Sequence, residues 1–389
     1  MLGNDIQIKQ LVGVGDVHLS FQPEQRVYCM IGENGIGKTK CLEALFISYL
    51  VHNNDFLSGD YAVFPERHFP FTSYISNLSS KALKPATGNY YDFEKVFFGT
   101  NYHNLPINFV GAQSRGYIRD GSEYNSSISR DNFDGIGVKE ERKSSYLDRL
   151  ITGVESTGLK DLNMDTDIEK WIIQRARSAN PYQSVEDNRE IEIKTLFDLL
   201  SKIDKRIDAS FLEISGNNRV FIKVADKKTE LSELSSGFAS ILKIMQSIIA
   251  GYSYFTNETN IAHVKGVVFI DEIESHLHTK WQATIIPTLK RLFPNTTFYI
   301  TTHSAIVLSQ LQHGEAYELY RDEDDGIVKT ELIEHPNNAA FVDLLKDAFD
   351  IDINKLKLAR DNAPQQKNAK KMLSALLEKR INELKEGTQ

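Results

Sequence analysis

The fold follows from one stretch of sequence, Tyr28-Cys29-Met30-Ile31-Gly32-Glu33-Asn34-Gly35-Ile36-Gly37-Lys38-Thr39. Its first part is apolar and of strand length, and its second part has the pattern G-x-x-x-x-G-K-T. Residues 41–50 then place their apolar side chains on one face of a helix. A strand, a glycine-rich turn and a helix in this order direct backbone N–H groups at a phosphate chain. The stretch therefore predicts a nucleotide-phosphate loop.

The residues of this phosphate loop, 32–39, have separate predicted tasks. Gly32, Gly35 and Gly37 let the backbone approach the phosphates and adopt conformations that a Cβ would forbid. Lys38 can reach the β- and γ-phosphates, and the Thr39 hydroxyl can ligate Mg²⁺. The other residues predicted to contact the nucleotide are Glu33, Asn34, Ile36 and Lys40.

Length, charge and cysteine content narrow the class of protein. The 389 residues suffice for one large or two modest domains, and 41% hydrophobic with 25% charged residues is typical of soluble globular chains. A net charge of -8 argues against a broadly basic surface for nucleic acid. Cys29 and Cys41 are predicted to be buried thiols in a reducing compartment. No apolar run has membrane-spanning length and residues 1–30 lack a signal-peptide pattern, so we expect a cytoplasmic protein.

Periodicity along the chain predicts short strands and amphipathic helices. Residues 51–110 are rich in aromatic side chains, which favours irregular structure with local core over a base-stacking platform. Residues 111–150 are rich in Ser, Asn, Asp, Arg and Gly, and we expect a mobile or partner-facing segment there. Strands are expected at residues 6–8, 17–21, 27–31, 107–110, 211–214 and 220–224, and helices at residues 168–178, 191–207 and 366–386.

A second stretch, residues 267–272 (VVFIDE), is an apolar run of strand length that closes on two carboxylates. A buried parallel strand delivers the side chains at its carboxyl end to the ligand crevice. Asp271 can hold Mg²⁺ through water, and Glu272 can polarise an attacking water as general base. Taken by itself, such a run is more often a strand that ends in a solvated acidic turn. Beside a phosphate loop, the catalytic interpretation is favoured.

Two further sites complete the pattern. Residues 234–238 (LSSGF) precede a predicted helix at 239–250, so Ser235 is either an ordinary N-cap or part of a second anion site at a helix N-terminus. Residues 301–304 (TTHS) follow an apolar strand at 297–300. That strand is expected beside the acidic one. A lone histidine such as His303 is usually structural, but this position favours a role in the site.

The four stretches occur in the order and spacing of ABC-type ATPase heads, and the chain resembles the RecF/SMC/OLD-like branch of that family over about residues 5–320. Residues 271–278 (DEIESHLH) are similar to the corresponding run of anti-phage defence ATPases, although Thr279 stands where that branch more often has Pro. The resemblance implies an α/β head whose mixed sheet surrounds the phosphate-loop helix. It also implies ATP and Mg²⁺ as cofactors.

The resemblance also implies roles for individual residues. Ser235 and Gly237 would contact the γ-phosphate held by another copy, so that two ATP molecules lie between two head-to-tail heads. Glu272 would activate water, His303 would sense the γ-phosphate, and Lys38 would stabilise the transferred charge. Gln113 is the candidate for the glutamine that follows a strand in such heads, although its match is only positional. Arg115 competes with Gln113 for this role.

Other interpretations of single motifs remain open. His276 and His278 with Glu274 could form a metal cluster, but contact at an interface beside the ATP site is favoured. The acidic run 322–325 is expected to be an exposed hairpin turn. About 195 residues separate Thr39 from Ser235, which is longer than in transporter ATPases and too short for the arms of SMC-type proteins. The roughly 85 residues after His303 are too few for the nuclease domain of OLD-type proteins.

We predict an ATPase core from residues 1–50 and 211–330, an inserted helical or irregular lobe at 51–210 and a helical extension at 331–389. The first functional hypothesis is an ATPase that serves as sensor, switch or scaffold in a multi-subunit anti-phage defence complex and controls a separate effector. Its expected partners are a second copy of itself and that effector, with no membrane. The alternatives are a DNA-repair ATPase that binds nucleic acid, and an ATP-bound scaffold with little turnover.

Overall fold

The computed structural model describes residues 3–57, 70–77, 79–83, 102–118, 139–156, 159–164, 166–179, 181–182, 184, 187–338, 344, 346, 352, 355 and 370–376. The chain divides into two compact units, Met1–Ala339 and Ala340–Gln389. All strands of the described part, and every residue predicted for the site, belong to the first unit. In the second unit residues 370–376 are helical, and the rest of the helix predicted at 366–386 lies outside the described residues.

A ten-stranded mixed sheet organises the first unit, in the order β5-β4-β1-β2-β13-β12-β3-β11-β10-β6. Neighbours from β12 to β6 are parallel, whereas β1, β4 and β5 pair antiparallel with their neighbours. The predicted α/β fold with a mixed sheet is therefore confirmed. The strands are β1 (Asp5–Leu11), β2 (Gly15–Ser20), β3 (Val27–Gly32), β4 (Ser73–Ser76), β5 (Ser79–Leu83), β6 (Ile107–Val110), β10 (Gly266–Ile270), β11 (Thr296–Thr301), β12 (Ala316–Arg321) and β13 (Val328–Leu332).

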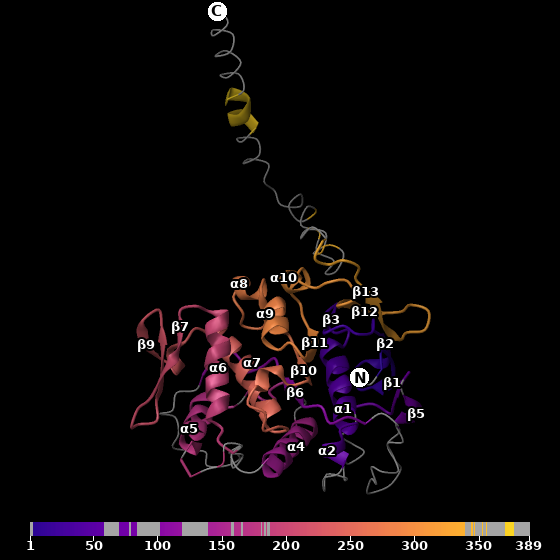
Figure 1. Cartoon of the computed structure of the whole chain (residues 1–389). Helices are drawn as coiled ribbons and strands as arrows, with labels where there is room; N and C mark the ends of the chain where they lie inside the picture. The colour runs from indigo at the N-terminus through magenta and orange to yellow at the C-terminus, as the bar shows by residue number, and fades with distance from the viewer. Residues whose placement is uncertain are drawn as a thin grey trace, which may run out of the picture. The chain divides into compact units, whose positions relative to one another are not determined.

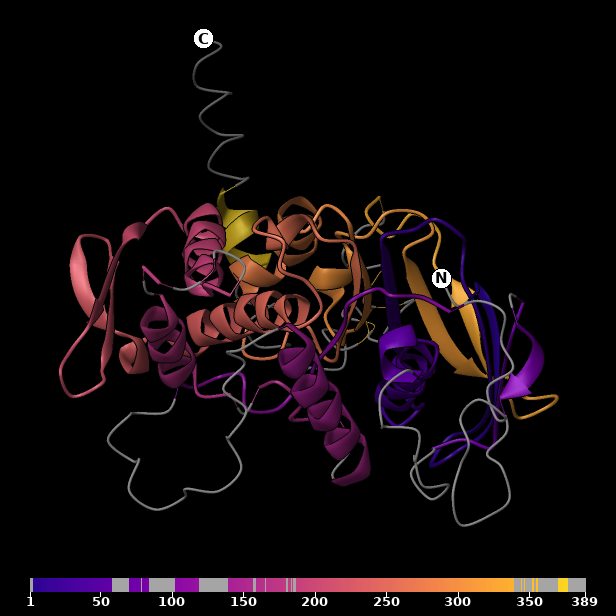
Figure 2. The same ribbon diagram turned by 60° about the horizontal axis from the view of Figure 1, so that its bottom comes forward.

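Helices pack against this sheet and extend beyond its β6 edge (Figure 1). Helix α1 contacts β1, β3, β6 and β11, so strands from both halves of the sheet curl around it (Figure 2). Helix α7 contacts both β6 and α6. The helices are α1 (Lys38–Val51), α2 (Asn54–Leu57), α4 (Lys139–Ser156), α5 (Ile168–Ser178), α6 (Glu190–Ile203), α7 (Ser236–Ser253), α8 (Thr279–Gln282), α9 (Ile285–Leu292) and α10 (Ala305–Leu308).

The central strands are buried because parallel strands covered on both faces must carry apolar residues at successive positions. Strands β3, β6 and β10 are buried at every position. Tyr299 stacks on Tyr28 and on Phe269, with ring centroids 4.9 and 5.1 Å apart, and so joins three neighbouring strands. Cys29 and Cys41 are buried free thiols, as predicted. Burial raises the pKa of Cys41 to about 12, so this thiol stays protonated at neutral pH.

Residues 51–210 do not form only an insertion, because three of their segments belong to the main sheet. Strand β4 pairs with β1, β5 pairs with β4, and β6 pairs with β10. The aromatic residues here reflect partly this packing, since Tyr74 on β4 is fully buried. Helices α4, α5 and α6 remain candidates for an inserted lobe. The predicted division into an ATPase core and an inserted lobe stays a prediction.

Two local predictions are wrong. The segment 111–150 was predicted to be mobile or partner-facing, but its residues 139–150 belong to α4, where Tyr146 and Leu150 are buried; whether this helix faces a partner stays a prediction. Residues 119–138 lie outside the described part. The helix predicted at 191–207 ends at Ile203. Asp204 ends it because its carboxylate accepts the backbone N–H of Arg206 at 3.0 Å, a turn that competes with helix. A second sheet follows, β7 (Ile207–Ile214), β8 (Val220–Val224) and β9 (Lys227–Glu230).

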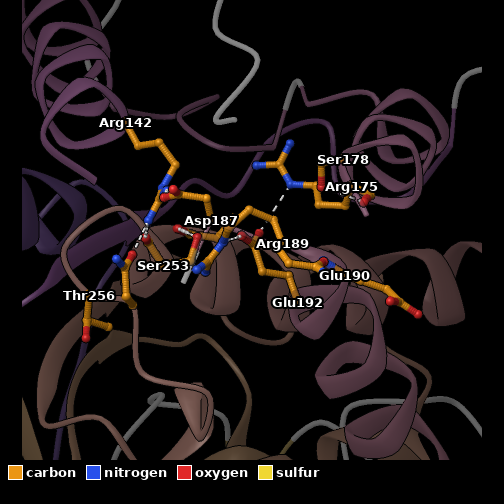
Figure 3. Close-up of polar contacts among 12 residues, drawn as sticks. Arg142, Arg175, Ser178, Asp187, Arg189, Glu190, Glu192, Ser253 and Thr256 are labelled. Atoms are coloured by element: carbon orange, nitrogen blue, oxygen red, sulfur yellow. Dashed lines mark hydrogen bonds and ion pairs between the residues drawn. The ribbon is translucent and has the colours of Figure 1, made fainter. Parts of the chain in front are cut away.

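A buried ionic cluster joins the helices beyond the β6 edge (Figure 3). The two carboxylate oxygens of Glu192 on α6 accept Nε–H bonds from Arg175 on α5, at 3.2 Å, and from Arg189, at 2.6 Å. Arg142 on α4 lies in the same cluster and donates to Asn257 at 2.5 Å. All three arginines are about 1% exposed and Glu192 is 0% exposed. Glu192 is the carboxylate that offsets the charge of two of these arginines.

Replacing Glu192 with Ala is therefore expected to lower the free energy of unfolding by about 3–5 kcal/mol, because it removes a buried carboxylate that pairs with two buried arginines. Chemical denaturation monitored by circular dichroism measures this change. Glu190→Ala on the same helix is the matched control. Glu190 pairs with Lys194 at 3.0 Å on the exposed face, and its loss should cost about 0.5 kcal/mol or less. Equal losses for the two variants would contradict the prediction.

The acidic run 322–325 forms the hairpin turn between β12 and β13, as predicted. Lys329 stabilises this turn through ion pairs with Asp322 at 2.5 Å and Asp325 at 2.7 Å.

Within the described residues, no helix is both long enough and apolar enough to span a membrane.

Candidate functional site

The carboxyl ends of four parallel strands meet at one edge of the sheet. Strand β11 lies between β3 and β10, and β6 follows β10. Strand β3 ends at Gly32, β11 at Thr301, β10 at Ile270 and β6 at Val110. The phosphate loop, the acidic turn (residues 271–278), the His303 loop and the segment with Gln113 therefore emerge side by side. This confirms the prediction that the strand before His303 lies beside the acidic strand.

The phosphate loop turns through backbone conformations that require glycine. Gly32 has φ 139°, and a Cβ there would lie 2.5 Å from the carbonyl oxygen of Leu319. Gly37 has φ 108° and precedes the first turn of α1. Lys38 is buried, and its Nζ donates to the carbonyl oxygens of Gly32 and Glu33, both at 2.8 Å. Desolvation lowers the pKa of Lys38, and the nearby carboxylate of Asp271 partly opposes this.

The exposed part of the loop runs from Glu33 to Gly35, and the N–H of Ile36 closes a turn onto the carbonyl of Glu33 at 3.4 Å. Lys40 forms an ion pair with Glu43 at 2.7 Å on α1. The predicted nucleotide contacts of Glu33, Asn34, Ile36 and Lys40 stay predictions.

Asp271 and Thr39 are brought together as the sequence predicted. Thr39 Oγ1 lies 3.0 Å from each carboxylate oxygen of Asp271, and the hydroxyl of Thr301 donates to Asp271 Oδ1 at 2.6 Å. Desolvation raises the pKa of Asp271, while these two threonine hydroxyls act in the opposite direction. The pair offers a hydroxyl and a carboxylate, which are the hard oxygen ligands that Mg²⁺ prefers. The donor set thus fits the predicted metal.

Glu272 occupies an unusual backbone conformation next to this pair. Its φ is 45°, in the left-handed region that non-glycine residues rarely adopt. Its N–H donates to Thr301 Oγ1 at 2.8 Å. Its carboxylate oxygen Oε2 accepts a hydrogen bond from Ser275 Oγ at 3.0 Å. A half-buried carboxylate held at both backbone and side chain is suited to orient a water molecule.

A pocket of about 340 Å³ brings these groups together. Gln113 lines it together with residues of the acidic turn, and its assignment as the glutamine of the site stays a prediction. Lys160 and Ser275 also line the pocket, and no sequence pattern identifies them. A larger cavity of about 680 Å³ between α6 and α9 contains none of the predicted site residues. The lining of the smaller pocket is Thr39, Ala112, Gln113, Lys160, Asp271, Glu272, Ser275 and His276.

Arg115 does not share the role of Gln113. It is fully buried, and its guanidinium donates to the backbone carbonyl oxygens of Gly111, at 2.6 Å, and Glu272, at 2.9 Å. It does not line the pocket. The competing assignment of Arg115 to nucleotide contact therefore loses its support.

Three other predicted site residues lie outside the pocket, namely Ser235, Gly237 and His303. Ser235 is exposed and caps α7, because its Oγ accepts the N–H of Phe238 at 3.4 Å. Gly237 is buried against Trp281, which a Cβ at that position would approach to 3.1 Å. The exposed His303 donates its backbone N–H to Glu274 Oε1 at 2.6 Å. None of these three residues lines the pocket of their own chain.

The alternative metal cluster around His276 and His278 gains no support. His278 caps the short helix α8, where its Nδ1 accepts the N–H of Lys280 at 3.2 Å. The carboxylate of Glu274 instead accepts a hydrogen bond from Thr302 Oγ1 at 2.6 Å. In the part of the chain that the structure describes, no three His, Cys, Asp or Glu side chains are grouped to hold a metal.

Known proteins resemble this chain in sequence and in fold. The Septu protein PtuA of Bacillus thuringiensis is 23% identical over 341 residues, which cover 84% of this chain and 78% of that protein. The retron Vc95 probable ATPase of Vibrio cholerae serotype O1 biovar El Tor is 34% identical over 147 residues. These cover 36% of this chain and 28% of the retron protein. The SMC head bound to the C-winged helix domain of ScpA aligns over 86% of this chain and 99% of that chain, with 12% identity and a TM-score of 0.44.

One protein-family model matches residues 27–309. The match contains the phosphate loop, the serine-capped start of α7, the acidic turn and His303, and it confirms the ATPase resemblance that these stretches predicted. It also covers well over half of the chain. The protein therefore belongs to the family described as "AAA domain, putative AbiEii toxin, Type IV TA system".

Proposed function

We propose that this protein binds and hydrolyses ATP as a regulatory switch in a multi-subunit anti-phage defence complex. The observation that carries the proposal is the pocket in which Thr39, Gln113, Asp271 and Glu272 meet at one edge of the sheet. A Mg²⁺ ligand pair and a general base in one pocket, at the end of a phosphate-binding loop, are the groups that phosphoryl transfer to water requires. The relatives named Septu protein and retron ATPase support the defence context.

Each residue of the site has a chemical task under this proposal. The phosphate loop holds the triphosphate by backbone N–H groups and the α1 N-terminus, and Lys38 exchanges its carbonyl partners for phosphate oxygens. Thr39 and Asp271 would hold Mg²⁺, which neutralises charge on the phosphates. Glu272 accepts a proton from the attacking water, and Gln113, which lines the same pocket, orients that water. Preorganised charges of this kind stabilise the developing negative charge on the γ-phosphate.

A second copy is proposed because Ser235 and Gly237, which are predicted to contact a γ-phosphate, do not line the pocket of their own chain. Ser235 lies at the exposed N-terminus of an 18-residue helix, α7, whose free N–H groups and positive dipole end suit an anion. In a head-to-tail pair the Ser235 turn of one copy would close over the γ-phosphate held by the other. ATP would then act as the contact between copies, and hydrolysis would release them.

The proposed partner beyond this pair is a separate effector protein. Under this proposal the ATP-bound pair and the separated copies present different surfaces. The effector therefore responds to the nucleotide state. We propose that the signal to which the complex responds acts on the same cycle. A signal molecule that binds one nucleotide state more tightly favours that state, and the nucleotide changes the affinity for the signal molecule by the same factor.

Purification of the tagged protein together with its native neighbouring gene products tests the proposal. We expect a second protein to co-purify, a change in mass on addition of ATP and Mg²⁺, and release of phosphate. A parallel purification of Lys38→Ala should show neither the change in mass nor the release of phosphate. A protein that releases no phosphate and keeps one mass in the presence and absence of ATP would overturn the proposal.

A further inference from the structure

Arg115 makes a set of contacts that the proposed chemistry does not use. Its three guanidinium nitrogens donate to four backbone carbonyl oxygens. Two of these, in Val110 and Gly111, lie at the end of β6. The other two belong to Asp271 and Glu272 at the end of β10. A single side chain thus joins the ends of two neighbouring strands at the point where Asp271 and Glu272 leave the sheet.

Burying this cation carries a cost that its carbonyl partners only partly offset. Arg115 is 0% exposed, and desolvation lowers its pKa to about 10, with Asp271 the largest opposing influence. A buried guanidinium is costly to retain unless its donors are satisfied. Here its hydrogen bonds go to backbone rather than to a carboxylate, so the arginine fixes the path of the chain. The hydrogen bonds from Arg115 therefore help to position Asp271 and Glu272.

The backbone of Glu272 needs such support because its φ of 45° is intrinsically unfavourable. A non-glycine residue in this region is strained and persists only where its surroundings hold it. Thr301 Oγ1 accepts its N–H, while its carbonyl accepts bonds from Arg115 Nη1 and from the N–H of Ser275, both at 2.9 Å. Because Arg115 also donates to the carbonyl oxygen of Asp271, removing it takes away a hydrogen bond from each of the two peptide groups that flank Glu272.

The segment that carries Arg115 is itself anchored from another helix. Lys243 on α7 is 3% exposed, and its Nζ donates to the carbonyl oxygens of Ser114, at 2.6 Å, and Met164, at 2.8 Å. The same ammonium group lies 5.1 Å from the ring centroid of Tyr117. The chain on both sides of Arg115 is therefore fixed to α7, so the guanidinium approaches the acidic turn from a rigid support.

We propose that Arg115 is a positioning residue that holds Glu272 in the geometry its role as general base requires. The inference rests on the proposed function for the role of Glu272, but the contacts of Arg115 can be tested without turnover. It assigns to Arg115 no contact with the nucleotide. Loss of Arg115 should therefore impair the chemical step much more than the binding of ATP.

The experiment combines amide hydrogen exchange with single-turnover ATP hydrolysis for Arg115→Met in the full-length chain. Met keeps much of the length and removes all of the donors. We expect faster exchange in peptides that cover residues 271–277, and unchanged exchange in peptides from α5 and α6. A displaced catalytic group costs about 10²-fold in rate, so we expect a fall of that order in the single-turnover rate with ATP affinity retained within about threefold.

Two further variants separate a local effect of Arg115 from a general loss of stability. Arg175→Met removes another buried arginine, which belongs to the cluster around Glu192 and not to the acidic turn. This variant should lower thermal stability without changing exchange at 271–277 or the single-turnover rate. Arg115→Lys keeps the charge but concentrates its donors on one nitrogen, so it should give an intermediate rate and an intermediate exchange. It also decides the question if Arg115→Met fails to fold.

The inference is overturned if exchange at residues 271–277 and the single-turnover rate match wild type in Arg115→Met, or in Arg115→Lys where only that variant folds. It is also overturned if Arg175→Met reproduces both effects, since the loss would then follow from stability alone. Absence of hydrolysis by the wild-type protein would reject the proposed function instead. In that case the exchange measurement still decides whether Arg115 holds the acidic turn.

Discussion

Glu272→Gln is expected to lower ATP turnover by about 10²–10⁴-fold, which is the usual contribution of a general base. The amide has nearly the same shape as the carboxylate and can still accept the hydrogen bond from Ser275 Oγ. It cannot take a proton from water. The groups that hold the triphosphate, Lys38 and the backbone of the phosphate loop, are unchanged, so ATP binding should persist. Phosphate release under saturating ATP measures the fall.

The same variant separates a switch from a passive scaffold. If hydrolysis opens the pair of copies, Glu272→Gln should accumulate as an ATP-bound dimer that wild type forms only transiently. Size-exclusion chromatography with light scattering, with and without ATP, detects this. Glu213→Gln is the control, because Glu213 pairs with Lys228 at 2.7 Å on the separate sheet and should behave as wild type. Unchanged assembly and unchanged activity in Glu272→Gln would favour the scaffold hypothesis and contradict the switch.

Ser235→Asp is expected to abolish ATP-dependent dimerisation while leaving the protein folded. Asp is as good an N-cap as Ser and also favours the positive end of a helix dipole, so α7 should keep its stability. Its carboxylate, however, would face the γ-phosphate of the other copy and repel it. We therefore expect no dimer from the double variant Ser235→Asp, Glu272→Gln at ATP concentrations that convert Glu272→Gln fully.

Ser235→Ala provides the converse control for this prediction. It removes the cap, since Ser235 Oγ accepts the N–H of Phe238, and should cost about 1 kcal/mol of stability. It adds no charge, so dimerisation should weaken without being lost. A Ser235→Asp protein that dimerises with ATP as wild type does would contradict the proposed contact. Thermal denaturation of both variants shows whether the cap was kept or lost.

The strands and helices closest to the site were the most predictable part of the fold. Residues 27–31 and 267–270 are apolar at every position, and such runs fit central parallel strands that are covered on both faces. The helix α5 has the bounds that its periodicity predicted, Ile168–Ser178, because its apolar residues recur at helical spacing and Asp167 caps it. The grouping of Thr39 with Asp271 followed from the order of strand ends at one edge of the sheet.

Other parts depend on contacts between distant residues and left no local pattern. The pairing of β4 with β1 was missed because its four residues, SYIS, have no turn or alternation long enough to mark a strand. Helix α4 was missed because its first turns are almost entirely charged. Arg115 was expected near the nucleotide, since arginine is seldom buried. Its carbonyl partners come from two strands that only the folded sheet brings together.

The central claim is that one copy completes the ATP site of another, and a crystal structure with a non-hydrolysable ATP analogue and Mg²⁺ tests it most directly. We predict two copies related head to tail, with the triphosphate on the phosphate loop of one copy. Ser235 Oγ of the other copy should then lie within hydrogen-bonding distance of the γ-phosphate. A nucleotide-bound structure in which Ser235 is far from every triphosphate, in each assembly that the protein forms, would contradict the account.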